Sequence, residues 1–149
     1  MSYQSRQSLD PAARTAAREG AATVGKLEHL DGQGRMVVAL LRGASLPGRE
    51  DDIAKVFGQM MMVFERHARR PLMRHHSDCA CLGADEAVMV QFVRLAARGA
   101  REDAMLMAML LLRADIAPLA VSMAEQLGLL INSVARAMPQ AMPPRGMYH

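Results

Sequence analysis

The most regular pattern in this 149-residue chain lies in its last third. Between Asp115 and Met138 the apolar positions alternate steps of four and three residues: Ile116, Ala120, Met123, Leu127, Leu130 and Val134. This spacing places them on one face of an α-helix and forms a heptad seam. It predicts a helix over 115–138 that packs inside a helical bundle. A protein partner, or self-association into a homodimer through this helix, is the alternative interpretation.

Helical patterns also cover most of the preceding chain. Helices are predicted over 10–19, from Asp31 to the segment 43–48, from Arg49 to Pro71, over 85–99, and from 101 to 112. The body of the fifth helix, Met105 to Leu112, is apolar on every side, which is typical of a central buried helix. No strand-like alternation of useful length is present.

These patterns predict an all-α fold, a compact helical bundle of five or six helices with one irregular segment. That segment, residues 71–83, contains both cysteines and is called the Cys/His loop below. We expect a single helical domain over 10–138, a disordered N-terminus over 1–9, and a flexible C-terminal tail over 139–149 that contains three prolines.

The location of the protein is inferred from what the sequence lacks. The first twenty residues contain no apolar stretch of the length that a secretory signal requires. The most apolar run, Ala104 to Leu112, is too short to cross a bilayer. We therefore expect a cytoplasmic protein without a membrane segment, in which paired cysteines favour metal binding or redox chemistry over a structural disulfide.

The Cys/His loop is the chemically densest part of the sequence. His75, His76, Cys79 and Cys81 fall within seven residues. Thiolate and imidazole are the ligands that zinc prefers, so we expect a zinc site here. Two adjacent histidines rarely hold one ion, because neighbouring side chains in an extended segment point apart. The expected ligands are therefore Cys79, Cys81, His75 and His67, which continues the buried stripe of the preceding helix, with His76 in reserve.

The pattern leaves other arrangements of the same residues open. Three ligands with an open fourth position would suit a catalytic site. Asp78 and Asp85 are either hydrogen-bond partners of a ligand histidine or, more simply, a turn residue and a helix cap. Without a metal, the loop would contain two half-buried thiols and solvent-facing histidines.

Positive charge is concentrated before the Cys/His loop. The formal net charge is +3, and the densest basic run comprises Arg66, Arg69, Arg70 and Arg74. Cations are favoured near helix C-termini, so a solvated helix end is the simpler interpretation. A nucleic-acid contact is the alternative, although no interleaved aromatic residues accompany the run.

Three functions follow from these features. The favoured one is a small interaction or regulatory module whose zinc ion attaches the Cys/His loop to the bundle. The second is a metal-responsive DNA-binding regulator, whose affinity for DNA would fall steeply with salt. The third is a thiol-dependent enzyme with Cys79 or Cys81 as nucleophile and His75 or His76 as base. Common catalytic motifs are missing, so we lean away from an enzyme.

Overall fold

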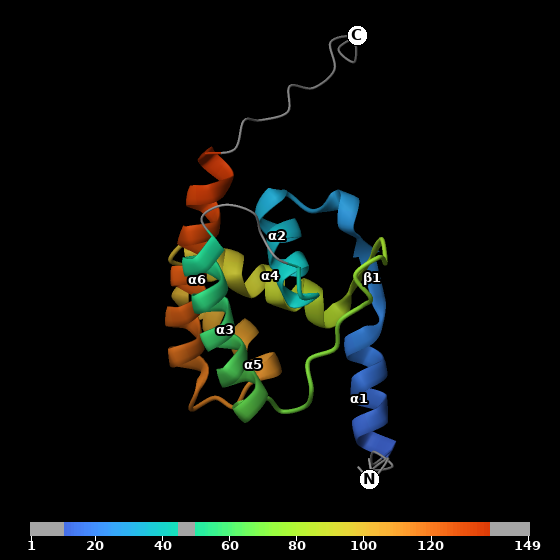
Figure 1. The fold of residues 1–149 in the computed structure, drawn as a ribbon. Coiled ribbons are helices and arrows are strands. Elements are labelled where there is room, and N and C mark those ends of the chain that lie inside the picture. Colours follow the sequence, from blue (N-terminus) through green and yellow to red (C-terminus); the bar gives the residue numbers. More distant parts are fainter. Residues whose placement is uncertain (1–10, 45–49, 138–149) are drawn as a thin grey trace, which may run out of the picture.

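A computed structural model describes residues 11–44 and 50–137 of the chain (Figure 1). This part contains six α-helices: α1 (Pro11–Ala21), α2 (Gly32–Leu41), α3 (Glu50–His67), α4 (Ala84–Ala97), α5 (Arg101–Leu111) and α6 (Ala117–Ala137). Two short strands, β1 (Thr23–Lys26) and β2 (Cys81–Gly83), and a 3-10 turn (Leu27–His29) complete it. The predicted all-α bundle is thus confirmed. The segments 1–9 and 139–149, for which disorder and flexibility were predicted, lie outside the described residues.

The central helix of the bundle is α4, which packs against α6, α5, α2, α1 and both strands. In Figure 1 it crosses behind α3, with α6 on one side and β1 on the other. Met89, Phe92 and Val93 on this helix are completely buried. The central position was predicted for α5, and that prediction is wrong. Leu106 and Leu110 of α5 are 60% and 61% exposed, because this helix covers only one flank of the bundle. The sequence of α5 shows that the helix is apolar on every side, but it does not show which sides pack against other helices.

The patterned C-terminal segment forms α6, which packs against α3, α4, α5 and α2. Ala120 and Leu127 of the predicted seam are completely buried, and Met123, Leu130 and Val134 pack against the core. Most of the seam is therefore used inside the chain, as the bundle interpretation expects. Self-association through this helix stays a prediction.

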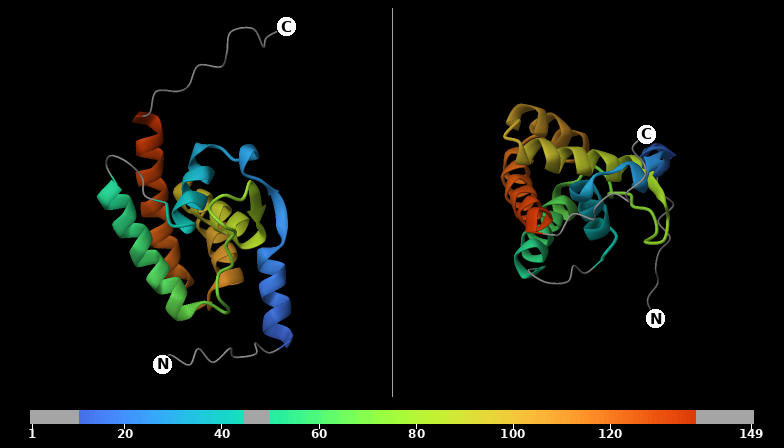
Figure 2. Two further views of the ribbon diagram at one scale, coloured as in Figure 1. Left: turned by 45° about the vertical axis from the view of Figure 1, so that its right-hand side comes forward. Right: turned by 90° about the horizontal axis from the view of Figure 1, so that it is seen from above.

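The two strands were not predicted from the sequence. They pair antiparallel, with Thr23 opposite Gly83, Gly25 opposite Leu82 and Lys26 opposite Cys81. They are only four and three residues long, and β1 is largely exposed on both faces. Neither strand therefore shows the alternation that reveals a longer strand. The sheet ties the end of the Cys/His loop to the segment after α1, as both views of Figure 2 show.

Within residues 11–44 and 50–137, no helix has the length and the apolar character needed to span a membrane.

Candidate metal centre

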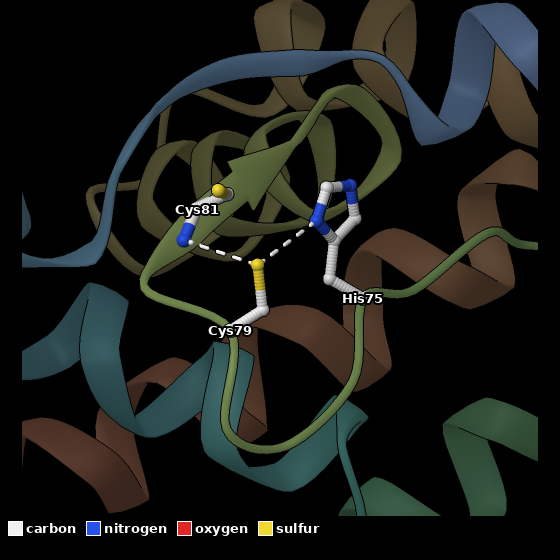
Figure 3. A group of neighbouring side chains, drawn as sticks. All are labelled: His75, Cys79 and Cys81. Atoms are coloured by element: carbon white, nitrogen blue, oxygen red, sulfur yellow. Dashed lines mark hydrogen bonds between the residues drawn. The ribbon is translucent and has the colours of Figure 1, made fainter.

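Three potential metal ligands meet in the Cys/His loop. His75, Cys79 and Cys81 each offer one donor atom, and the three atoms lie within 4.8 Å of one another. The His75 Nδ1 atom is 3.6 Å from the Cys79 Sγ atom. The Cys79 sulfur also accepts a hydrogen bond from the Cys81 backbone N–H at 3.4 Å. Figure 3 shows His75 and Cys79 facing each other across the loop, with Cys81 on the adjoining strand.

Local backbone structure brings these residues together. A turn at Ser77 and Asp78 reverses the chain, and the Cys79 N–H donates to the His76 carbonyl at 3.0 Å. Cys79 thereby returns to the side of His75. Cys81 is the first residue of β2 and is held by its pairing with Lys26 of β1. The turn and the strand together bring three half-buried residues into one group. His75 and Cys79 are four positions apart in the sequence, and Cys79 and Cys81 are two positions apart.

A backbone contact orients His75 for ligation. Its Nε2 atom lies 2.7 Å from the Ala21 carbonyl oxygen, which can only accept a hydrogen bond. Nε2 therefore carries the proton, and the Nδ1 lone pair of the neutral ring points at the Cys79 sulfur. Metal-binding histidines usually donate their other N–H to a carbonyl or carboxylate in this way.

Gly83 leaves the space in which the His75 ring lies. A Cβ atom at this position would come 2.8 Å from His75 Cδ2 and 2.9 Å from Nε2. Such distances are much shorter than ordinary carbon contacts. The φ angle of Gly83 is −79°, so the requirement for glycine is steric and concerns the imidazole.

Arg42 anchors the loop, a role that was not predicted from the sequence. Its Nη1 and Nη2 atoms donate to the Cys79 and Cys81 carbonyls, both at 2.7 Å. Its Nε and Nη2 atoms also donate to the Glu86 carboxylate at 2.7 and 2.9 Å. The side chains of Arg42 and Glu86 are only 4% and 0% exposed. A buried arginine 37 residues from Cys79 leaves no local pattern, so no sequence signal indicated this role.

The same contacts change the acidity of the three groups. The His75 hydrogen bond, aided by the Cys81 N–H, lowers the pKa of Cys79 to about 7. The hydrogen bond with Cys79, and the one with the Ala21 carbonyl, raise the pKa of His75. The hydrogen bond to Cys79 and the charge of that thiolate raise the pKa of Cys81. Cys79 is therefore the thiol that ionises first.

Two predicted ligands lie apart from this group. His67 is the last residue of α3, and its carbonyl accepts from the Arg113 N–H on the chain after α5. Its position on the apolar face of α3 indicated that the His67 side chain would point inward, but not which residues it would contact. His76 has a side chain that is 78% exposed, and its Nδ1 atom lies 3.6 Å from an Asp78 carboxylate oxygen. Neither histidine belongs to the group of three donors found in the described part of the chain.

In the described contacts, neither Asp78 nor Asp85 pairs with the three-donor group; Asp78 is a turn residue, as the simpler alternative expects, whereas the N-cap of α4 is Gly83 and not Asp85. Asp78 is 90% exposed and lies beside His76, not beside a member of the three-donor group. Asp85 is buried, and both its oxygens accept from the Arg70 guanidinium at 2.6 and 2.7 Å. Its place near the site is taken by Glu86, which accepts from the N–H of Gly83, the N-cap of α4, at 3.0 Å. Glu86 was not identified from the sequence as part of the site.

Three of the four arginines in the basic run hold other parts of the chain. Arg69 Nε donates to the Met109 and Leu112 carbonyls at the end of α5, both at 3.0 Å. Arg74 Nη1 donates to the Leu41 carbonyl at the end of α2, at 2.7 Å. Arg70 pairs with Asp85, while Arg66 is exposed. Most of the run therefore serves the C-termini of other helices and a salt bridge, contacts that neither interpretation of the run predicted.

The donor set fits a zinc ion. Two sulfurs and one imidazole nitrogen are the preferred ligands of zinc, and two thiolates would balance its charge. A Cys₂His set leaves one of four tetrahedral positions for water or an incoming group. The structure thus contains a group that can hold a metal, with three protein ligands.

Comparison with known proteins adds no assignment: no family model, no curated protein and no solved structure matches this chain.

Proposed function

We propose that the protein is a zinc-binding regulatory module whose ligands are His75, Cys79 and Cys81. The observation that carries this proposal is the orientation of His75. Its Nε2–H is bound to the Ala21 carbonyl, so that Nδ1 faces the Cys79 sulfur. The three donors thus converge, and within residues 11–44 and 50–137 no fourth donor joins them, so a tetrahedral ion held by these three would have one position open. An open position suits a site that exchanges its metal or accepts a group from a partner.

Metal binding would act on more than the loop, because the three ligands are attached to different elements. His75 is bonded to the last residue of α1, and Cys81 belongs to the strand that continues into α4. Arg42 of the α2 C-cap binds the carbonyls of both cysteines. An ion that fixes the ligands relative to one another therefore also holds α1 and the β1–β2 sheet against the rest of the helical bundle. Such coupling makes metal binding a source of folding free energy.

The proposal is tested by zinc titration of the metal-free protein, with thermal unfolding measured alongside. We expect about one zinc per chain and a higher Tm in its presence. The variants His75→Asn and Cys79→Ser/Cys81→Ser should lose the tight binding and the Tm increase.

Two histidine variants serve as matched controls. His76→Asn and His67→Asn remove the same chemical group from residues outside the three-donor group, and both should bind zinc like the natural chain. A loss of affinity in His67→Asn equal to that in His75→Asn would contradict the proposed ligands. Zinc binding without any effect on Tm would contradict the folding role.

A second candidate function has its own observation in the acidity of Cys79. A thiol with a pKa of about 7 beside an imidazole is partly ionised near neutral pH. A metal-free thiol enzyme would use the Cys79 thiolate as nucleophile with His75 as its base. This function predicts that protein purified without chelators contains no zinc and that Cys79 is alkylated at the same rate before and after treatment with a chelator. Protection of Cys79 by stoichiometric zinc would favour the metal site.

A further inference from the structure

A cavity lies where α3 ends and the Cys/His loop begins, and none of the three candidate metal ligands lines it. Its volume is about 430 Å³, which is within the range of small-ligand sites. Its apolar lining includes Met61 and Phe64 from α3 and Leu72 from the loop. Met61 and Phe64 are 9% and 1% exposed, so the apolar wall is part of the core surface.

Three arginines line the same cavity, Arg69, Arg70 and Arg74. Arg69 and Arg74 are each held by a contact that uses only some of their N–H donors, whereas the contact of Arg70 neutralises its charge. The Arg70 group is paired with Asp85, so its charge is balanced. Arg69 is held through Nε alone, by the Met109 and Leu112 carbonyls.

Arg74 is held through Nη1, by the Leu41 carbonyl. Among residues 11–44 and 50–137, no acceptor is described for either Nη group of Arg69 or for Nε and Nη2 of Arg74. Two anchored cations with donors to spare therefore adjoin an apolar wall. Since their side chains are already ordered, an anion would bind them with a smaller loss of conformational entropy.

We propose that this cavity binds a small amphipathic carboxylate, with its charged group on Arg69 and Arg74 and its apolar chain against Met61, Phe64 and Leu72. The lining contains one carboxylate, Glu65, against three arginines, of which Asp85 balances one. The remaining excess is one positive charge, which matches a monoanion. The apolar wall would add nothing to the binding of a free inorganic anion, so the ligand combines both features.

The test uses sodium octanoate, with 1-octanol and sodium acetate as probes that each lack one feature. Binding is followed by calorimetry and by the NMR signal of the Met61 methyl group, which reports directly on the cavity wall. We expect octanoate to shift this signal and to bind at least about tenfold more tightly than either octanol or acetate. Arg69→Gln and Arg74→Gln should each weaken octanoate binding by about tenfold or more.

Three further variants test whether octanoate binds in this cavity. Arg66→Gln removes the same charge from an exposed residue near the end of α3 that does not line the cavity, and should bind octanoate normally. Leu72→Trp keeps both arginines and fills the cavity, so it should block binding even if the arginine variants unfold. In metal-free protein, Cys79→Ser/Cys81→Ser should bind octanoate like the natural chain, because none of the three candidate metal ligands lines the cavity.

Several outcomes would overturn the proposal. Equal affinity for octanoate and octanol would indicate an apolar hollow without anion recognition. Equal affinity for acetate or inorganic phosphate and octanoate would indicate a simple anion site. An equal loss in Arg66→Gln would indicate a general effect of surface charge.

Discussion

The guanidinium of Arg42 and the carboxylate of Glu86 form a buried ion pair between the end of α2 and the first turn of α4. Their Nε and Oε2 atoms are 2.7 Å apart, although the residues are 44 positions apart in sequence. Because Arg42 also donates to the Cys79 and Cys81 carbonyls, the pair joins the Cys/His loop to two helices of the bundle. The position of the candidate ligands therefore depends on a charge pair that is not itself part of the ligand set.

The first prediction concerns removal of Arg42. Arg42→Gln leaves the Glu86 carboxylate buried without its cation and frees both cysteine carbonyls. Breaking a buried pair from one side typically costs about 3–5 kcal/mol of unfolding free energy. We expect a loss of this order in urea unfolding, together with weaker zinc binding.

The control for Arg42 is an exposed pair. Arg113 lies 3.0 Å from Asp115, and these side chains are 58% and 64% exposed. Exposed pairs contribute about 0–1 kcal/mol, so Arg113→Gln should unfold almost like the natural chain. Similar losses in the two variants would show that burial of the Arg42 pair does not matter.

The second prediction concerns stability in acid. Burial opposes ionisation of Glu86, but the hydrogen bonds from Arg42 and the Gly83 N–H outweigh it and lower the pKa of this carboxyl. A carboxyl whose pKa is lower in the folded state stabilises the fold above its unfolded pKa of about 4.3. That stability is lost as the pH falls through the lower folded value. Urea midpoints measured from pH 6 down to pH 3 should therefore fall.

Glu86→Gln provides the comparison for the acid measurement. This variant should be less stable at pH 6, because Arg42 has lost its partner. Its urea midpoint should also decline less between pH 6 and pH 3, because one titrating carboxyl is gone. An unchanged decline would show that other carboxyls govern stability in acid.

The third prediction compares two glycines. Gly83→Ala would place a methyl group 2.8 Å from His75 Cδ2 and 2.9 Å from Nε2, which forces the imidazole out of the position in which Nε2 binds the Ala21 carbonyl and Nδ1 faces Cys79. Displacing a metal ligand by changing its support typically costs about 10–100-fold in affinity, and we expect zinc titration to show a loss in this range.

Gly58 offers a matched glycine-to-alanine control in α3. No atom lies within 4 Å of a Cβ placed on it, and it is exposed. Gly58→Ala should leave zinc binding unchanged and stabilise the helix by about 0.5–1 kcal/mol. Equal zinc affinity in the two alanine variants would show that the His75 ring does not need the space at Gly83.

The fourth prediction concerns the order in which the thiols ionise. In metal-free protein, the alkylation rate of Cys79 by iodoacetamide should rise with a midpoint near pH 7, where its thiolate forms. Cys81 should react only at higher pH, since its pKa is raised. In His75→Asn the Cys79 midpoint should move up toward the ordinary value of 9.0. If the midpoint is the same in His75→Asn, the imidazole is not the cause of the lowered pKa of Cys79.

Zinc affinity should follow the same order of ionisation, which provides a fifth prediction. Zinc displaces the proton of any thiol that is still protonated, so its apparent affinity should rise with pH. Well above pH 7 the proton released should come mainly from Cys81, and at lower pH Cys79 and the imidazole of His75, whose pKa is raised, should release protons as well. Calorimetry in buffers of different ionisation enthalpy counts these protons. Proton release that is independent of pH would contradict thiolate ligation by Cys79.

The all-helical fold could be predicted from the sequence because it rests on local spacing. The stripe that includes Ile53, Val56, Met60 and Phe64 shows the 3.6-residue period of a helix, and all four residues are buried. The candidate ligands Cys79 and Cys81, with His75, were also identifiable, since they lie within seven residues and have the chemistry of zinc ligands. Both features depend on neighbours along the chain.

The tertiary structure alone decided what depends on residues far apart in sequence. His75 was singled out over His67 and His76 by the Ala21 carbonyl, which lies 54 positions away. The loop is held by Arg42, and its last residues pair with a strand too short to show a pattern. A buried charge that is balanced by a partner far away in the sequence, as in the Arg42 and Glu86 pair, leaves no periodic pattern in the local sequence. Sequence spacing therefore determined the helices and the donor atoms, while packing between elements determined which donors meet.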